Sequence, residues 1–235
     1  MAKRATTEDP PSGMPDKRRA ILRGALTVFA RDGYSRAGID RICAEAGVST
    51  RTLYNHFGDK ASLFQAVMVD STAEVSDRLI GIIDRHFWKV TDLETDLIAW
   101  GRAMVSPMPE YDDHFALVQQ INAETAHIPT HAWNSWQAAG PSRVRGELAS
   151  HLQGLADRGL LRVDDPDRAA FHLMLLISGP LPSPAHRDRR PPEAEVDEIV
   201  ASGVRAFLHG YATQGRREDD STRPDSTARS GASGP

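Results

Sequence analysis

Between residues 49 and 60 the chain gathers side chains that can hydrogen-bond to nucleic acid. Arginine and asparagine can make paired hydrogen bonds to base edges, whereas hydroxyl, imidazole and ammonium groups suit phosphate oxygens. No acidic residue occurs between Ser49 and Gly58, so nothing in that stretch repels a phosphate backbone. The candidate DNA-contacting residues are Ser49, Thr50, Arg51, Thr52, Tyr54, Asn55, His56 and Lys60.

Two short helices are expected to position these side chains. A stripe with spacing i, i+3, i+4, i+7 predicts the first helix and consists of Ile39, Ile42, Cys43 and Ala46. Gly47 can end that helix in the left-handed conformation, and Ser49 can cap the next one. Leu53 and Phe57 then face inward, which is the layout of a helix-turn-helix whose second helix enters the major groove. The alternative is an ordinary helical hairpin whose polar face meets water.

The segment GVSTRTLYNHFGDKASLF, residues 47–64, resembles the signature of the tetracycline-repressor (TetR) family of bacterial regulators. With the preceding helix, the resemblance covers about residues 16–70. Ala37 and Gly38 stand where the family commonly has Thr or Ser, so a cap for the first helix of the motif would have to come from Ser35 or Arg36. The resemblance implies a homodimer that binds a double-stranded DNA operator and responds to a small-molecule effector.

The motif also suggests a division of roles among its polar residues. Base-edge contacts are expected from Arg51 and Asn55, assisted by Thr50 and Thr52. Phosphate contacts are expected from Tyr54, His56 and Lys60, while Ser49 caps the helix. Lys3 and Arg4 could also touch DNA, although a solvated arm is the simpler reading.

Charge favours a nucleic-acid partner for the N-terminal part only. The whole chain carries a net charge of −4. Residues 1–60 hold 11 basic and 7 acidic residues, a net charge of +4, whereas the remainder holds 17 basic and 25 acidic residues, a net charge of −8. A single cysteine excludes an internal disulfide framework. Without a visible signal peptide, or the roughly 20 apolar residues that span a bilayer, we expect a cytoplasmic protein.

Apolar periodicity predicts an all-α chain with two domains. The expected divisions are a disordered arm at 1–15, a helix-turn-helix DNA-binding domain at 16–62, a helical effector-binding and dimerisation domain at 63–213, and a disordered tail at 214–235. A helix from about Lys60 to Phe87 should join the two domains. Gly140-Pro141 should kink or divide the segment 130–158, and Pro166 should open a new helix.

Two C-terminal helices, about 166–179 and 193–213, predict a dimer interface. AAFHLMLLI at 169–177 is apolar all round, so burial on both sides is expected. The second helix carries an unbroken stripe of Val196, Ile199, Val200, Gly203, Val204, Phe207, Leu208 and Tyr211. This stripe could fill an intramolecular core. We favour a four-helix interface with a second subunit, because the resemblance implies a dimer and paired motifs match two half-sites.

Aromatic, methionine and a few polar side chains on helices that should converge predict an effector cavity. They are Trp100, Met104, Phe115, Gln119, Asn122, Trp133, Trp136, His172 and Met174. The alternative is that these side chains fill the core.

Catalytic and metal-binding motifs are weak. Glu124-x-x-His127 lacks the second copy that a di-iron bundle needs, and Pro129 interrupts the spacing between His127 and His131. No P-loop, G-x-S-x-G or dinucleotide fingerprint is found. We therefore expect a regulator that is not an enzyme and has no cofactor or metal. The alternative is a helical small-molecule-binding protein or enzyme in which the helix-turn-helix is only structural.

Overall fold

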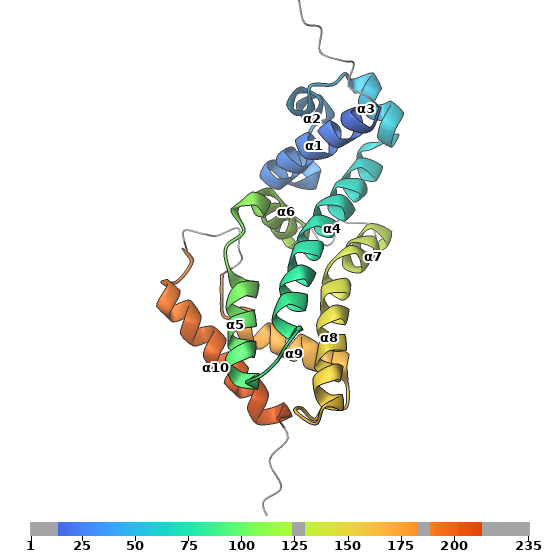
Figure 1. Ribbon diagram of the computed structural model, residues 1–235. Helices are drawn as coiled ribbons and strands as arrows, with labels where there is room; N and C mark the ends of the chain where they lie inside the picture. Colours follow the sequence, from blue (N-terminus) through green and yellow to red (C-terminus); the bar gives the residue numbers. More distant parts are fainter. Residues whose placement is uncertain (1–13, 124–129, 183–188, 213–235) are drawn as a thin grey trace, which may run out of the picture.

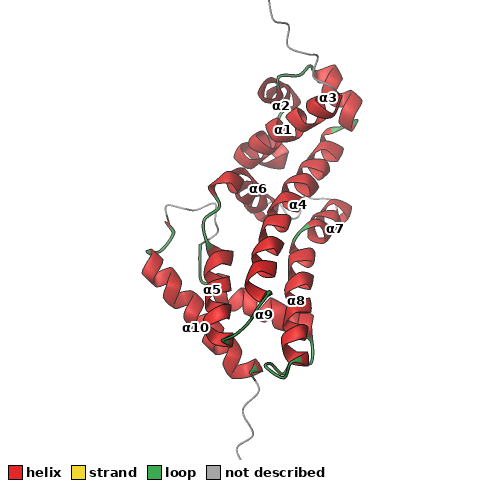
Figure 2. Ribbon diagram, in the orientation of Figure 1, coloured by secondary structure: helices red, strands yellow, loops and turns green. Residues whose placement is uncertain are grey.

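The computed structural model describes residues 14–123, 130–182 and 189–212 of the chain (Figure 1). Figure 2 shows that every regular element in these ranges is helical, which confirms the all-α prediction. None of the described helices is long and apolar enough to cross a membrane. The elements are α1 (Met14–Arg36), α2 (Ile39–Ala46), α3 (Thr50–Phe57), α4 (Lys60–Phe87), α5 (Leu93–Val105), η1 (Pro109–Tyr111), α6 (Asp112–Ala123), α7 (Thr130–Ala139), α8 (Pro141–Asp157), α9 (Pro166–Ser178) and α10 (Glu193–Tyr211).

The expected tail and most of the expected arm lie outside the described residues, as do Glu124, His127 and Pro129. The arm was predicted to reach residue 15, whereas α1 already begins at Met14.

α1, α2 and α3 form the upper end of the molecule in Figure 1 and share an apolar core. α1 is interrupted at Gly33, whose φ of 76° lies in the left-handed region, so the helix is kinked there. α2 ends at Gly47 with a φ of 65°, as predicted. Ile42 and Leu53 are fully buried between these helices, which holds α2 and α3 against α1.

α4 is the long helix that joins the two ends of the molecule, and it spans the residues that the apolar pattern predicted. Leu63 and Met68 are fully buried in the upper core, whereas Ile83 and Phe87 belong to the lower one. The predicted domain boundary at residues 62 and 63 therefore falls inside a continuous helix. Both ends of the molecule share this one element.

The lower core is enclosed by α5, α8, α9, α10 and the last turns of α4. Trp100 and Phe207 are its largest fully buried side chains. Gly140 separates α7 from α8, and Pro166 opens α9, as the sequence predicted. Asp165 caps α9 because its carboxylate accepts a hydrogen bond from the Arg168 N–H at 3.0 Å.

α6 and α7 lie between the two ends and contribute to the upper core. α6 packs along α1 and buries Leu117 and Ile121 there. α7 adds Ala132 and Trp136 to the same core. The upper unit is therefore completed by helices that are distant in sequence from α1–α3.

The last two helices, α9 and α10, pack against each other within the chain. Most of the α10 stripe packs within the chain, against α5 and α9, while Ile199, Leu208 and Tyr211 stay half-buried. Gly203 makes this packing close, since a Cβ there would lie 2.4 Å from the Leu176 carbonyl oxygen. α9, which was predicted to be buried on both sides, is covered on one side within the single chain; Phe171, Leu175 and Leu176 on the other side are 46%, 49% and 37% exposed. One face of α9 packs against α8 and α10. The other face is uncovered within the chain.

Candidate functional site

The start of α3 is fixed by a side-chain cap. Ser49 has an extended backbone, and its hydroxyl oxygen accepts a hydrogen bond from the Thr52 N–H at 3.1 Å. The hydroxyls of Ser49 and Thr52 also lie 2.9 Å apart. Thr52 therefore takes part in the cap. Its side chain lies on the half-buried side of the helix. This hydrogen bond confirms the predicted capping role of Ser49.

α3 is anchored on one face and open on the other. Leu53 is fully buried, and Phe57 is half-buried beneath the Arg18 guanidinium, whose carbon lies 5.4 Å from the ring centroid. On the opposite face Arg51 and Asn55 are exposed and one helical turn apart. Within the described part of the chain, no side-chain hydrogen bond or ion pair engages either of them. Their donors and acceptors are therefore available to an external partner.

Thr50 and Tyr54 are also exposed, whereas His56 is half-buried beside Phe57. Tyr54 has 44% of its surface exposed, so its hydroxyl can reach an external partner. Together these residues form a polar surface around Arg51 and Asn55. Its composition of hydroxyl, amide, guanidinium and imidazole groups suits DNA.

Lys60 begins α4 and is tied to the end of α1. Its ammonium group lies 4.9 Å from the centroid of the Tyr34 ring and donates a hydrogen bond to the Ser35 carbonyl oxygen at 3.4 Å. The sequence pointed to a phosphate contact and gave no sign of this packing role. The turn before Lys60 is held by Asp59, which caps α4 by accepting from the Ser62 N–H at 2.7 Å. This bond lowers the pKa of Asp59.

α2 begins after Gly38, which has no side chain that could cap the helix. An ion pair secures α2 instead. Asp32 lies 3.0 Å from Arg31 and 2.7 Å from Arg41, which joins α1 to α2. The hydrogen bonds from Arg31 and Arg41 lower the pKa of Asp32 to about 2. The carboxylate therefore stays charged at neutral pH, and the link between α1 and α2 is maintained.

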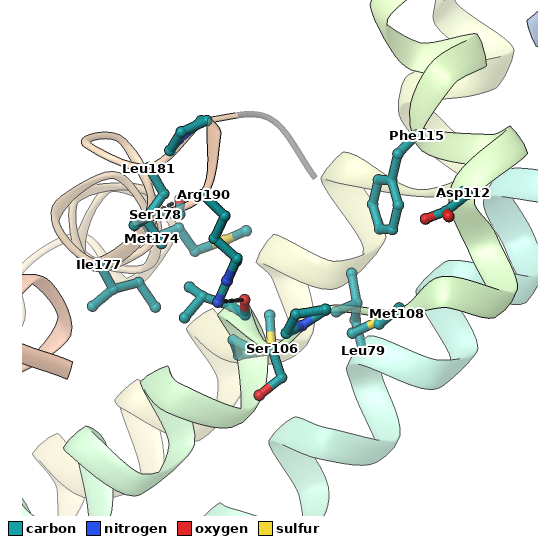
Figure 3. Close-up of a pocket in the computed structure, with 14 residues that line it drawn as sticks. Leu79, Ser106, Met108, Asp112, Phe115, Met174, Ile177, Ser178, Leu181 and Arg190 are labelled. Carbon is teal, nitrogen blue, oxygen red and sulfur yellow. Dashed lines mark hydrogen bonds between the residues drawn. The ribbon is translucent and has the colours of Figure 1, made fainter. Parts of the chain in front are cut away.

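A cavity of about 350 Å³ lies between the end of α5, α6 and α9. Met104, Phe115 and Met174 line it, as the sequence predicted. Figure 3 shows Phe115 and Asp112 on the α6 side, facing Met174 and Arg190 across the space. Arg190 donates a hydrogen bond to the Val105 carbonyl oxygen at 2.8 Å, which holds the segment before α10 against the end of α5.

The other predicted cavity residues lie elsewhere. Trp100 is fully buried against Phe87, with ring centroids 5.7 Å apart, so it is a core residue. Trp133 and Trp136 pack on each other in the upper core, because α7 turns toward α4 before the break at Gly140. His172 is exposed and its Nδ1 lies 2.8 Å from the Tyr211 hydroxyl. Gln119 and Asn122 of α6 have interactions of their own and do not line the cavity.

The polar residues of the cavity were missed by the sequence reading. They are Ser106, Asp112, Ser178 and Arg190. All four stand at helix ends or in connections, where hydrophobic periodicity carries no information. Prolines that interrupt the helical pattern near residues 107–109 and 180–192 were the available signal for a cavity at these helix ends.

α6 connects the cavity to the upper unit. Asp112 and Phe115 line the cavity, and between them the Asp113 carboxylate accepts a hydrogen bond from the Thr27 hydroxyl of α1 at 2.8 Å. The next residue, His114, is buried against α4, where its Nδ1 lies 3.3 Å from the Ser71 hydroxyl. Burial lowers the pKa of His114 to about 4. A single short helix therefore touches the cavity, α1 and α4.

Comparisons with known proteins agree with this geometry. Residues 21–67 match the family described as bacterial regulatory proteins, tetR family, and residues 95–213 match the AefR-like transcriptional repressor C-terminal domain. An HTH-type transcriptional repressor from Mycobacterium tuberculosis is 37% identical, over 68% of this chain and 90% of that protein. The HTH-type transcriptional repressor AcnR of Corynebacterium efficiens is 29% identical, over 68% of this chain and 76% of AcnR.

Solved structures give the same result. The crystal structure of a TetR-family regulator from Mesorhizobium loti has a TM-score of 0.74 and 26% identity, and the match covers 86% of this chain and 99% of that one. The flavonoid-responsive regulator FrrA has a TM-score of 0.62 and 25% identity, with 86% and 100% of the two chains covered.

Proposed function

The chain belongs to the TetR family of bacterial transcriptional regulators, and we propose that it represses transcription by reading an operator through the exposed face of α3. It is a DNA-binding regulator; repression is the finer statement, and similarity to proteins described as repressors supports it. The observation that carries the proposal is the pair Arg51 and Asn55, exposed on a capped and anchored helix. Such a regulator acts in the cytoplasm, where bacterial DNA lies.

Each residue of the α3 surface has a proposed part in DNA binding. Arg51 and Asn55 read base edges in the major groove, with Thr50 beside them. Tyr54, His56 and Lys60 bind phosphates, which position α3 without reading sequence. Thr52 supports the Ser49 cap and assists from the edge of the surface. The bond from Lys60 to Ser35 couples its phosphate contact to the end of α1.

We also propose that the DNA-binding form is a homodimer in which α9 and α10 of each subunit meet. Phe171, Leu175 and Leu176 support this arrangement, because a contiguous apolar face on one helix is costly to leave in water. Two α3 helices related by a two-fold axis then address two inverted half-sites. The α10 stripe stabilises the interface indirectly, by holding α9 in place from behind.

The cavity is the proposed effector site. Its lining is mostly apolar, with Arg190, Asp112 and two serines as polar groups, which is typical of small-molecule sites. An effector that contacts Phe115 presses on α6, and α6 is bonded to α1 through Asp113 and Thr27. Operator affinity changes only if the effector prefers one position of α6 over another.

We propose that the cavity binds without catalysing. The Ser106 and Ser178 hydroxyls donate to the carbonyl oxygens of Arg102 and Met174, one turn earlier in each helix. Neither hydroxyl is paired with a base, and no histidine or cysteine is among the described residues that line the cavity. An activated nucleophile needs such a partner.

The test is a mobility-shift assay with the DNA that flanks the protein's own gene, at two salt concentrations and with random DNA as competitor. The proposal predicts a specific complex of two protomers per site that weakens as salt rises. If only ligand binding is found and no specific complex forms with any promoter fragment, the helix-turn-helix is a structural remnant and the protein is a small-molecule carrier.

A further inference from the structure

A cluster of three metal-ligating side chains lies away from both the α3 surface and the cavity. Asp84 stands near the end of α4, and Glu147 and His151 stand four residues apart on the facing side of α8. Their ligand atoms all lie within 4.8 Å of one another. We propose that these three residues bind one divalent transition-metal ion of the Zn²⁺ class in each subunit.

The separations suit a metal centre. The His151 Nε2 atom lies 3.1 Å from an Asp84 oxygen and 3.6 Å from a Glu147 oxygen. Zinc binds imidazole nitrogen and carboxylate oxygen at about 2.0–2.2 Å, so two ligand atoms on one tetrahedral ion stand roughly 3.3–3.5 Å apart. Both distances from His151 are close to this separation, so one ion can lie within reach of all three side chains. The fourth position is left to water.

The charge of the cluster also favours a cation. The two carboxylates bring two negative charges to one place, beside an imidazole nitrogen that can also bind a metal ion. The nearby arginines of α8 do not compensate this charge, because Arg143 pairs with Asp77 and Arg145 pairs with Asp167. Among the described ion pairs, those of Asp84 and Glu147 involve His151 alone. A divalent ion would balance the charge of the two carboxylates.

The arrangement is held before any ion arrives. The His151 ring packs on Phe87 of α4, with centroids 5.2 Å apart, and the side chain is 27% exposed. The position of His151 is therefore set by the lower core, while Asp84 at 56% exposure leaves a path to solvent. An imidazole among the ligands favours zinc, cobalt or nickel over magnesium and calcium, which prefer oxygen.

Bound metal joins the lower half of α4 to α8. This inference goes beyond the proposed regulator function and does not depend on DNA binding. The sequence contained one part of the signal, Glu147 and His151 at helical spacing i, i+4. The third ligand is 63 positions before Glu147, and only the packing of α4 on α8 brings it close.

The test is titration of the untagged, metal-free full chain with Zn²⁺ in competition with a chromogenic chelator, together with Co²⁺ absorption spectra. The wild type should bind about one equivalent per protomer, and its melting temperature should rise when zinc is added. Glu147→Gln, His151→Asn and, from the other helix, Asp84→Asn should each lose this equivalent and the thermal shift. His209→Asn, an exposed histidine on α10, is the matched control and should retain both.

Two results would overturn the proposal. One is a wild type that binds no more zinc than the Glu147→Gln and His151→Asn variants. The other is one bound equivalent of zinc that is lost in the His209→Asn control but kept in the Asp84, Glu147 and His151 variants. Circular dichroism of each variant separates a lost site from a lost fold, and the partial exposure of all three ligands makes folding of these variants the expected outcome.

Discussion

At the scale of residues, the helix-turn-helix is built from contacts that are local in sequence. Ser49 caps α3, Gly47 turns the chain and Leu53 anchors the helix, and each does so through neighbours within a few positions. Arg51 and Asn55 then face outward because the helical period places them opposite Leu53. For this reason the whole surface could be predicted from a short stretch of sequence.

Arg51→Ala tests the proposed base contact. If Arg51 makes a bidentate contact with guanine, the substitution should cost roughly 1–3 kcal/mol on the operator and leave binding to random DNA nearly unchanged. Competition mobility-shift assays with operator and random duplexes give both values. Arg19→Ala removes an exposed arginine of α1 and serves as control. Equal weakening of Arg51→Ala on both DNAs would assign this side chain to the phosphate backbone instead.

His114 predicts an acid-sensitive stability. Its pKa is lowered to about 4 by burial, so the folded state favours the neutral ring, and stability is lost as pH falls from the ordinary value of 6.5 toward 4. The contribution of this group should be about 2 kcal/mol smaller at pH 5 than at pH 7.5. Urea unfolding of wild type and His114→Gln at both pH values measures it. The free energy of unfolding of the variant should depend less on pH than that of the wild type. An equal pH dependence in both proteins would mean that the folded protein protonates His114 as readily as the unfolded chain does.

At the scale of elements, the packing of helices determines which apolar faces are buried within the chain. The α10 stripe could serve either a core or an interface, and its contacts with α5 and α9 bury most of it within the chain. The same packing leaves the outer face of α9 as the available apolar surface. Trp133 and Trp136 lie in the upper core for a similar reason, since the break at Gly140 fixes the direction of α7.

Gly203→Ala tests the close approach of α9 and α10. A Cβ at this position would lie 2.4 Å from the backbone oxygen of Leu176, so the helices must separate, at a cost of about 1–3 kcal/mol. Gly210→Ala on the same helix is the matched control, because nothing lies within 4 Å of its added Cβ. The control should be neutral or stabilising by about 0.5–1 kcal/mol. Equal unfolding free energies for the two variants would contradict this account of the α9–α10 packing.

Leu175→Glu tests the proposed dimer interface. Leu175 is 49% exposed within the chain, so the substitution should leave the subunit folded while placing a charge in the apolar contact. Light scattering after size-exclusion chromatography should show a shift from dimer to monomer. Glu198→Gln, on the exposed side of α10, provides a comparison that should remain dimeric. A dimer that survives Leu175→Glu at the wild-type dissociation constant would place the interface elsewhere.

At the scale of the whole molecule, function depends on contacts between distant parts of the chain. α4 carries both cores, and α6 touches the cavity, α1 and α4. The cavity residues Arg190 and Ser178, and the cluster of Asp84 with His151, could not be predicted because convergence of separate helices is a tertiary property. Met104, Phe115 and Met174 were predicted correctly as lining residues since they stand on the inner faces of helices with clear periodicity.

The most direct test of the central claim is selection of DNA from a random library by the full-length dimer, with an Arg51→Ala/Asn55→Ala double variant in parallel. The wild type should enrich one motif of two inverted half-sites, because two α3 helices address the major groove about one helical turn or a multiple of it apart. The double variant should enrich no motif while retaining salt-sensitive binding to bulk DNA. A wild type that enriches no sequence, or a double variant that enriches the same motif, would contradict sequence reading by α3.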